Sequence, residues 1–301
     1  MYKKSFIKKP KVTSTGTYEK VSGVRPSEKK ISTSPVLKER YKKPLSTSWG
    51  AVADWYDSHL ATSNDTYHAH VIFPNVLRIL GEVKGKKVLD LACGQGIFTE
   101  QLADLKADVT GVDIGKELIA IAEKNSLAKK KKGVTIQYHV ASANDLYMIK
   151  SDTCDVVVCI LALQNIENLE KTTEELSRVL KKGGRSIIVL NHPMFRNPRK
   201  TQWGYDEENG TQYRRVDEYM SESHVKIDMT PGNKTDKKYT ISFHRPLQMY
   251  MKTFLKQGLS LVRLEEWISH RESKSGPKQK AENTARKEIP LFMCLEMVKV
   301  S

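Results

Sequence analysis

Long apolar runs are missing from this chain of 301 residues. No stretch approaches the roughly 18 apolar residues that a membrane span needs, so we expect none. Residues 1–5, MYKKS, open no apolar segment of the kind found in a secretory signal. Hydrophobic residues still make up 39% of the chain, which is enough for a folded core. These features predict a cytoplasmic protein.

Cysteine is scarce and scattered. The four cysteines are Cys93, Cys154, Cys159 and Cys294, and no two of them form a Cys-x-x-Cys pair. No histidine stands at a spacing that would complete a zinc site. The pattern excludes a disulfide framework and predicts buried, reduced thiols without a bound metal.

Acidic residues are rare at the start of the chain. Residues 1–45 hold thirteen Lys and Arg against three Glu, so most of the net charge of +15 belongs to this stretch. Its Lys, Ser, Thr and Pro content without apolar periodicity predicts a disordered basic tail over residues 1–47. Such a tail, with Lys129–Lys132 and Arg214-Arg215 beside Tyr213, would suit RNA phosphates. The alternative is that the tail only solubilises the protein and the lysine run is a solvated turn.

Residues 48–301 are predicted to form one folded domain in which strands and helices alternate, the pattern of a parallel sheet. Strands are expected at 87–91, 108–112, 134–140, 155–160 and 185–191. Helices are expected at 96–105, 115–128 and 168–180, with Gly183-Gly184 ending the last one and turning the chain into its strand.

The flanking segments extend this domain. Two helices are expected before it, one over 51–60 and one after residues 64–66 that Pro74 bends or restarts. Residues 192–244 predict a polar and aromatic insert on the substrate side. After it we expect a helix over 246–257, strands at 259–267 and 291–299, and a mobile polar loop over 270–290.

The fold class that follows is α/β, doubly wound and Rossmann-like. It has a mostly parallel seven-stranded sheet with an antiparallel last strand, a helical lid at the N-terminal side and a disordered basic tail.

A glycine turn follows the strand at 87–91. Gly94 and Gly96 lack the Cβ that would block the approach of a ligand to the backbone, and glycine accepts a positive φ in a tight turn. A nicotinamide dinucleotide site would want a third glycine near position 99, which is Thr99. Asp113 ends the next strand, and its carboxylate can accept both hydroxyls of a ribose. Any adenosine cofactor would benefit from this arrangement.

Four stretches carry a resemblance to a known family: VLDLACGQG, VTGVDIG, DVVVCILALQNIEN and LSRVLKKGGRSIIVL. They lie in order within residues 86–191, which resemble the class I S-adenosylmethionine-dependent methyltransferases in their small-molecule, ubiquinone-biosynthesis-like branch. The tail resembles this branch only at SFHRPLQMYMKTFLKQGL and at the final strand pair.

The resemblance implies S-adenosylmethionine as the cofactor and assigns residues to it. The residues implied at its methionine end are Asp90, Ala92, Gly94 and Gly96. Asp113 would take the ribose and Ile114 one adenine face, and Ser142, Ala143 and Ile160 complete the predicted site. The family often has an acid at the position of Ser142, so Asn144, Asp145 or a backbone group near Ala143 would replace it. The alternative for both aspartates is a purely structural hydrogen bond.

The catalytic candidates lie on loops at the carboxyl ends of the strands, where such sheets bind ligands. They are Gln164, which would orient a substrate, His192, as a base or a substrate contact, and His244, as a base. Substrate contacts are expected from Tyr56, Asn165 and Arg245, and Trp55, Tyr56 and Tyr67 would form the lid. The alternatives are loop capping for the amides, a core role for the aromatic residues and pairing with a helix carboxylate for Arg245.

The predicted function is methyl transfer from S-adenosylmethionine to a small molecule. Adenine-N6 methylation is not expected, because no Asn/Asp-Pro-Pro-aromatic motif follows residues 155–160. Cytosine-C5 methylation is not expected either, because Cys159 lies inside an apolar strand. Methylation of RNA or a ribonucleoprotein recruited by residues 1–45 stays open, as does a cofactor-binding protein without catalysis. The oligomeric state is left open.

Overall fold

The computed structural model describes residues 65–130, 136–230 and 237–300. The predicted basic tail and the helix over 51–60, with Trp55 and Tyr56, therefore lie outside the described residues. Lys131 and Lys132 also lie outside them. None of the described helices is long and apolar enough to cross a membrane.

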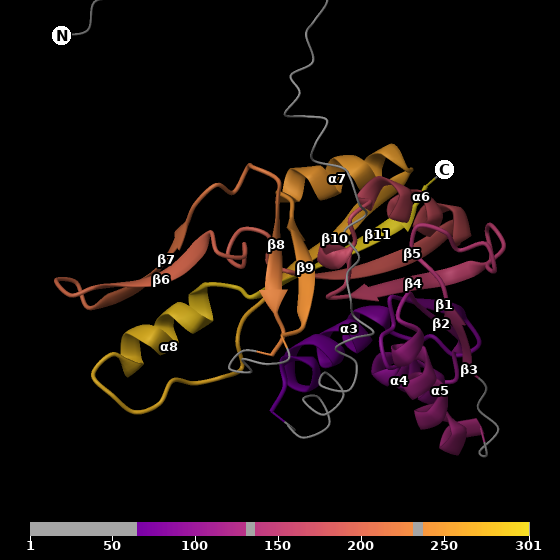
Figure 1. Ribbon diagram of the computed structural model, residues 1–301, viewed down its shortest axis with the longest axis horizontal. Helices are drawn as coiled ribbons and strands as arrows, with labels where there is room; N and C mark the ends of the chain where they lie inside the picture. Colours follow the sequence, from indigo (N-terminus) through magenta and orange to yellow (C-terminus); the bar gives the residue numbers. More distant parts are fainter. Residues whose placement is uncertain (1–64, 131–135, 231–236, 301) are drawn as a thin grey trace, which may run out of the picture. The chain divides into compact units, whose positions relative to one another are not determined.

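A seven-stranded sheet in the order β10-β11-β5-β4-β1-β2-β3 forms the centre of the domain (Figure 1). Strand β11 pairs antiparallel with both β5 and β10, while β1 to β5 pair in parallel. This confirms the predicted Rossmann-like class with its antiparallel last strand. The strand bounds are β1 (Lys87–Leu91), β2 (Asp108–Asp113), β3 (Ile136–Val140), β4 (Cys154–Ile160), β5 (Leu180–Asn191), β10 (Leu259–Trp267) and β11 (Phe292–Lys299).

Helices cover both faces of the sheet. Side chains alternate along a strand, so Val88 packs with α3 (Phe73–Leu80) and α4 (Ile97–Asp104), while Leu89 packs with α6 (Leu169–Val179) and α7 (Leu247–Lys256). In Figure 1 these two pairs of helices lie on opposite sides of the sheet. Helix α5 (Lys116–Lys130) connects β2 to β3. Each face thus buries its own apolar cluster.

Pro74 restarts the helix that the sequence predicts after residues 64–66. A π-helical turn, η2 (His68–Ile72), runs directly into α3, which carries the proline in its first turn. Pro74 has no N–H to donate to a carbonyl of the preceding turn. The wider π turn of residues 68–72 is therefore tolerated just before it. The Thr66 hydroxyl accepts a hydrogen bond from the Ala69 N–H at 3.1 Å, which caps the entry to this turn.

The expected insert over 192–244 contains two antiparallel hairpins: β6 (Thr201–Asp206) with β7 (Thr211–Val216), and β8 (Ser223–Asp228) with β9 (Tyr239–His244). The first hairpin turns at Asn209-Gly210, where Gly210 has a φ of 59°. The Tyr213 ring occupies the position that a Cβ on Gly204, its cross-strand partner, would take. Tyr213 therefore stabilises the hairpin.

Two sequence predictions are wrong. The expected mobile loop over 270–290 contains a helix, α8 (Gln279–Glu288), which packs against β7. Ala285 is the only buried residue of this helix, so the segment shows little apolar periodicity. The pair Gly183-Gly184 does not end α6, which stops at Val179. Both glycines lie within β5, where its register with β4 shifts.

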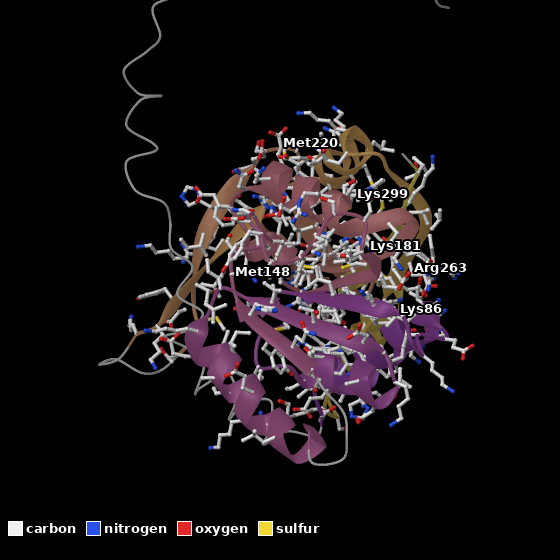
Figure 2. All side chains as sticks on the ribbon, turned by 90° about the vertical axis from the view of Figure 1, so that its right-hand side faces the viewer. Lys86, Met148, Lys181, Met220, Arg263 and Lys299 are labelled. Carbon is white, nitrogen blue, oxygen red and sulfur yellow. The ribbon has the colours of Figure 1, made fainter. Side chains whose placement is uncertain are left out.

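Ion pairs link the sheet at the edge where its parallel strands begin. Figure 2 looks at this side, and the labelled Lys181 and Lys299 bind Asp155 and Asp152 at 2.6 and 2.7 Å. Farther along β11, the buried Glu296 bridges Arg185 of β5 and Arg263 of β10 at 2.7 and 3.0 Å. Glu296 therefore joins three strands through one carboxylate.

We expect Glu296→Gln to lower the free energy of unfolding by about 2 kcal/mol, because two arginines would lose their shared charge partner in a largely buried setting. Urea denaturation measures this, and Glu288→Gln at the exposed end of α8 is the control. Equal stability of the two variants would contradict the bridging role of Glu296.

Candidate functional site

The glycine turn lies between β1 and α4, as predicted, and its backbone is unusual. Ala92, Gly94 and Gly96 have φ values of 59°, 57° and 79°. The alanine carries the cost of a left-handed conformation, which L-residues adopt only when their surroundings compensate for it. The Cys93 N–H donates to the Val112 carbonyl at 3.0 Å, so the turn is tied to β2.

The two glycines of the turn serve different purposes. A Cβ on Gly94 would meet no atom within 4 Å, so the space beside Gly94 is open to a ligand. A Cβ on Gly96 would collide with the Tyr138 hydroxyl and lie 3.0 Å from Ala122. The Tyr138 ring also lies against Gly111 of β2, 2.8 Å from where its Cβ would be. Packing of Tyr138 thus explains Gly96 and Gly111, whereas only Gly94 has the open side expected at a ligand site.

Asp113 is buried and connects the two loops of the site. One carboxylate oxygen accepts from the Gly94 N–H at 2.9 Å and the other from the Gly115 N–H at 2.8 Å. Burial raises the pKa of Asp113, and these backbone N–H groups oppose that rise. Each oxygen keeps a second acceptor position. The predicted ribose contact therefore fits the geometry, although it would share the carboxylate with a structural role.

Asp90 is buried deeper, with 2% of its surface exposed. Its carboxyl accepts a hydrogen bond from the Thr99 hydroxyl of α4 at 2.6 Å. Burial raises its pKa from an ordinary 3.8 to about 7, a rise that Thr99 opposes and Asp113 reinforces. The contact with Thr99 supports the structural alternative, and contact with the methionine end of a cofactor stays a prediction.

The expected adenine side lies at the ends of β2 and β3. Ile114 is 59% exposed directly after Asp113, which leaves an apolar surface free to cover a ring. In the loop after β3, Ser142 accepts from the Asn144 N–H at 3.2 Å, and Asn144 itself accepts from Thr172. Asp145 is exposed, so it is the better placed of the two acceptors considered as a replacement for an acid at position 142. Ala143 is half-buried in the same loop.

The loop after β4 holds Gln164 and Asn165, while the half-buried Ile160 ends the strand. Both amides donate to the carbonyl of Leu161, at 2.6 and 3.3 Å, and Leu161 has a φ of 53°. This is the capping role considered as their alternative. The Gln164 Oε1 atom, however, is buried without a hydrogen-bond partner, so one acceptor at this loop stays unused.

His192 and His244 are both buried and hydrogen-bonded. His192 Nε2 lies 2.7 Å from Glu266, and its Nδ1 accepts from the N–H groups of Met194 and Phe195, which places the ring proton on Nε2. His244 Nε2 donates to the Tyr219 carbonyl at 2.8 Å. Burial lowers the pKa of both rings. The contacts of His192 favour a structural role over that of a base.

Arg245 pairs with backbone carbonyls in place of the helix carboxylate considered from the sequence. Its Nη2 donates to Ile166 and Glu167 at 2.9 and 2.6 Å, while Nη1 is buried without a partner. Arg245 therefore anchors the loop that carries Gln164 and Asn165. The structure brings these three together, whereas Tyr56 lies outside the described residues.

One grouping of possible metal ligands was not predicted. Asp65, His70 and His270 place one ligand atom each within 4.8 Å of one another. No sequence spacing indicates this, because about 200 residues separate the two histidines. His270 Nε2 already bonds Asp65 at 2.6 Å, and Arg271 lies 3.5 Å from the same carboxylate. The contacts seen are a hydrogen bond with His270 and an ion pair with Arg271, through which Asp65 joins the loop after β10.

Comparison with known proteins agrees with this geometry. Residues 89–188 match the methyltransferase domain family, which is about a third of the chain. Among curated proteins, the ubiquinone biosynthesis O-methyltransferase of Paraburkholderia phymatum is 36% identical over 100 residues, which are 33% of this chain and 42% of that protein. Its counterpart from Aeromonas salmonicida is 33% identical over 119 residues, 40% and 48% of the two chains. The matches thus span less than half of either relative.

Solved structures extend the likeness over more of the fold. An S-adenosylmethionine-dependent methyltransferase from Mesorhizobium loti superposes with a TM-score of 0.59 at 24% identity, covering 75% of this chain and 96% of that one. Another from Clostridium acetobutylicum gives 0.52 at 15% identity, covering 84% and 99%. Residues 89–188 therefore resemble a methyltransferase domain, and the solved structures show that the fold around them is the one seen in S-adenosylmethionine-dependent methyltransferases. S-adenosylmethionine is the cofactor that this resemblance implies.

The two glycines of the turn are expected to respond differently to alanine. Gly96→Ala adds a clash with Tyr138 to the strain of a positive φ and should cost about 3 kcal/mol of unfolding free energy. Gly94→Ala should cost only about 1 kcal/mol, but it should weaken S-adenosylmethionine binding at least tenfold, because its Cβ enters the open side. Gly183→Ala, with a φ of 76° and open surroundings, is the control for strain alone. Similar stability losses at Gly94 and Gly96 would contradict this division.

Asp90 is expected to make stability depend on pH. Because its folded-state pKa lies above that of an unfolded chain, its protonated form is favoured on folding, and this contribution is lost as pH rises from about 4 to about 7. Asp90→Asn removes the effect. The variant should therefore gain about 2 kcal/mol relative to wild type between pH 5 and pH 8. Urea denaturation at both pH values measures the difference, and a constant difference would refute the raised pKa.

Proposed function

We propose that this protein transfers a methyl group from S-adenosylmethionine to a small-molecule acceptor. The observation that carries the proposal is the arrangement around Asp113. Its buried carboxylate lies between the open side of Gly94 and the exposed Ile114, at the carboxyl edge of a parallel sheet. This is where such folds bind their ligands.

The residues present fit the cofactor. Asp113 would hold the ribose hydroxyls, Ile114 and the loop at Ser142–Ala143 would enclose the adenine, and the backbone at Gly94 would lie against the methionine end. Gln164 would offer its unused Oε1 to the same edge. The bound cofactor supplies an activated methyl on a sulfonium.

The protein itself would have to align the acceptor with the methyl group and keep water out of the site. Displacement of a methyl from a sulfonium is in-line, so the acceptor atom must be held opposite the sulfur. The loop after β4 is suited to this task because the double hydrogen bond from Arg245 holds it in place. A general base is required only for acceptors that must lose a proton early, and the contacts of His192 make it a poor base.

The small-molecule acceptor is favoured over RNA by the insert. Arg214 and Arg215 point to opposite faces of β7, since Arg214 donates to Thr201 while Arg215 is largely exposed and pairs with Asp217. The Tyr213 ring lies over Gly204. These contacts argue against the hypothesis from the sequence that Tyr213, Arg214 and Arg215 form one surface for RNA phosphates. Recruitment of RNA by residues 1–45 and a cofactor-binding role without catalysis remain the alternatives. The cytoplasmic location also stays a prediction.

Binding of the cofactor is tested by calorimetry with S-adenosylmethionine. Asp113→Ala should weaken binding about 100-fold or more, because it removes two charge-assisted hydrogen bonds. Asp108→Ala, at the exposed opposite end of β2, is the matched control and should bind like wild type. Equal affinity of the Asp113 variant and wild type would mean that the ribose site lies elsewhere.

The acceptor is tested with labelled S-adenosylmethionine and a cell extract separated into small molecules, RNA and protein. We expect label in the small-molecule fraction. Label in RNA that disappears on deletion of residues 1–45 would favour the alternative acceptor, and no label in any fraction would favour the non-catalytic one.

A further inference from the structure

A cavity of about 230 Å³ lies beyond the carboxyl end of β5. Three arginines and three aromatic residues line most of it: Arg196, Arg214, Arg286, Tyr67, Phe195 and Trp203. Phe195 and Arg196 follow β5, and Ser269, another lining residue, follows β10. Because β5 and β10 run in the same direction as β1, the cavity opens at the same edge of the sheet as the glycine turn.

The three arginines lack acidic partners. Elsewhere in the described chain arginines typically pair with carboxylates, as in Arg78–Glu265, Arg178–Glu175 and Arg185–Glu296. Among the described residues, no carboxylate lies within 4 Å of the guanidinium groups that line the cavity.

The few contacts of these arginines leave most of their donors unused. Arg214 donates to the Phe195 carbonyl at 3.1 Å and to Thr201 at 2.6 Å, and Arg286 donates to Ser273 at 3.0 Å. Among the residues that the structure describes, the Arg196 guanidinium contacts only the ring of Phe292, whose centre lies 5.2 Å from the guanidinium carbon. Each guanidinium has five N–H donors, so most of these donors have no protein partner among the described residues and are open to solvent or to a ligand.

Three positive charges around one cavity are unfavourable in free energy when no opposite charge lies near them. Burial lowers the pKa of Arg196, Tyr67 opposes this, and the charge of Arg214 lowers it further. Burial lowers the pKa of Arg214 as well. Partly buried like charges are normally compensated by an opposite charge. The compensating charge is therefore expected on a ligand.

The shape of the cavity limits what that ligand can be. Guanidinium groups bind carboxylates and phosphates through paired hydrogen bonds. Aromatic walls favour a flat apolar body, and the Trp203 ring is already stacked under Arg214, 5.0 Å from its guanidinium carbon. A cavity of about 150 Å³ holds benzene, so this one has room for a ring with an acidic group.

We propose that this cavity binds an organic anion, a carboxylate or phosphate on an aromatic body. Resting on the proposed function, the anion is the acidic group of the methyl acceptor. Tyr67 closes the cavity from the N-terminal side through its contact with Ser269, 3.2 Å between the two hydroxyl oxygens. Neutral analogues bind poorly, since they leave the arginines unpaired.

The test uses the full-length protein and calorimetry with phenyl phosphate, 1-naphthoate and the neutral 1-naphthamide. Wild type is expected to bind the two anions and to bind the amide at least tenfold more weakly. Arg196→Gln and Arg286→Gln should each weaken anion binding at least tenfold. Arg215→Gln is the matched control, because Arg215 neighbours Arg214 on β7 but points away and pairs with Asp217.

Thermal unfolding shows whether the variants fold. Without ligand, Arg196→Gln should unfold at the same temperature as wild type or higher, because an unpaired charge is removed. Phenyl phosphate should raise the midpoint of wild type and of Arg215→Gln but not that of Arg196→Gln. Equal anion affinity in wild type and both cavity variants, or no anion binding by wild type, would overturn the proposal.

Parallel titration with S-adenosylmethionine separates this inference from the proposed function. The cavity variants should bind S-adenosylmethionine like wild type. If wild type binds the anions but no S-adenosylmethionine, the proposed function fails and the anion site stands. If a short single-stranded RNA displaces phenyl phosphate at lower concentration than 1-naphthoate does, the cavity holds a nucleotide phosphate and the small-molecule ligand is overturned.

Discussion

The candidate site depends on one buried carboxylate. Asp113 ends β2 and accepts N–H donors from Gly94 and Gly115, so it joins the turn after β1 to the loop that follows its own strand. Parallel strands place these loops at one edge of the sheet, and the shared acceptor Asp113, together with the bond from the Cys93 N–H to the Val112 carbonyl, fixes their backbones relative to each other. Because protein surrounds most of the carboxylate, water neither screens these hydrogen bonds nor competes for them strongly. In the proposed function, a ribose bound beside Gly94 would use the remaining acceptor positions of Asp113.

Paired and unpaired charges lie at opposite edges of the sheet in the folded domain. The paired charges stabilise the fold, and the unpaired ones lie near the proposed ligand sites. At the edge where the parallel strands begin, Lys181 and Lys299 have carboxylate partners, and Glu296 satisfies two arginines at once within the sheet. On the opposite edge, Arg245 donates to two backbone carbonyls, and neither Arg245 nor the arginines that line the cavity have an acidic partner among the described residues. A protein gains stability by pairing buried charges, so arginines left unpaired near a cavity indicate a place where a ligand completes the structure.

Much of the fold could be predicted because its signals are local. The strand before the glycine turn and the strand at 259–267 have the expected bounds, because Gly85 and Gly258 mark the turns just before them. The prediction missed helix α8 because its one buried residue is Ala285 and not a bulky apolar residue, so hydrophobic periodicity gives almost no signal. The position of Gly183-Gly184 was misread for another reason. Glycine marks a helix end or a strand irregularity equally well, and only pairing with β4 distinguishes the two.

The sequence by itself determined the class of fold, the cofactor that the family resemblance implies and the order of the site loops, because these depend on motifs read along one stretch of chain. Only the tertiary structure decided which of those residues face a ligand. It separated Gly94, which is open, from Gly96, which Tyr138 packs against, and it showed both nitrogens of His192 to be engaged. It also gathered Arg196, Arg214 and Arg286 around one cavity. These outcomes depend on contacts between residues far apart in the chain, and such contacts form only when the sheet brings their strands and loops together.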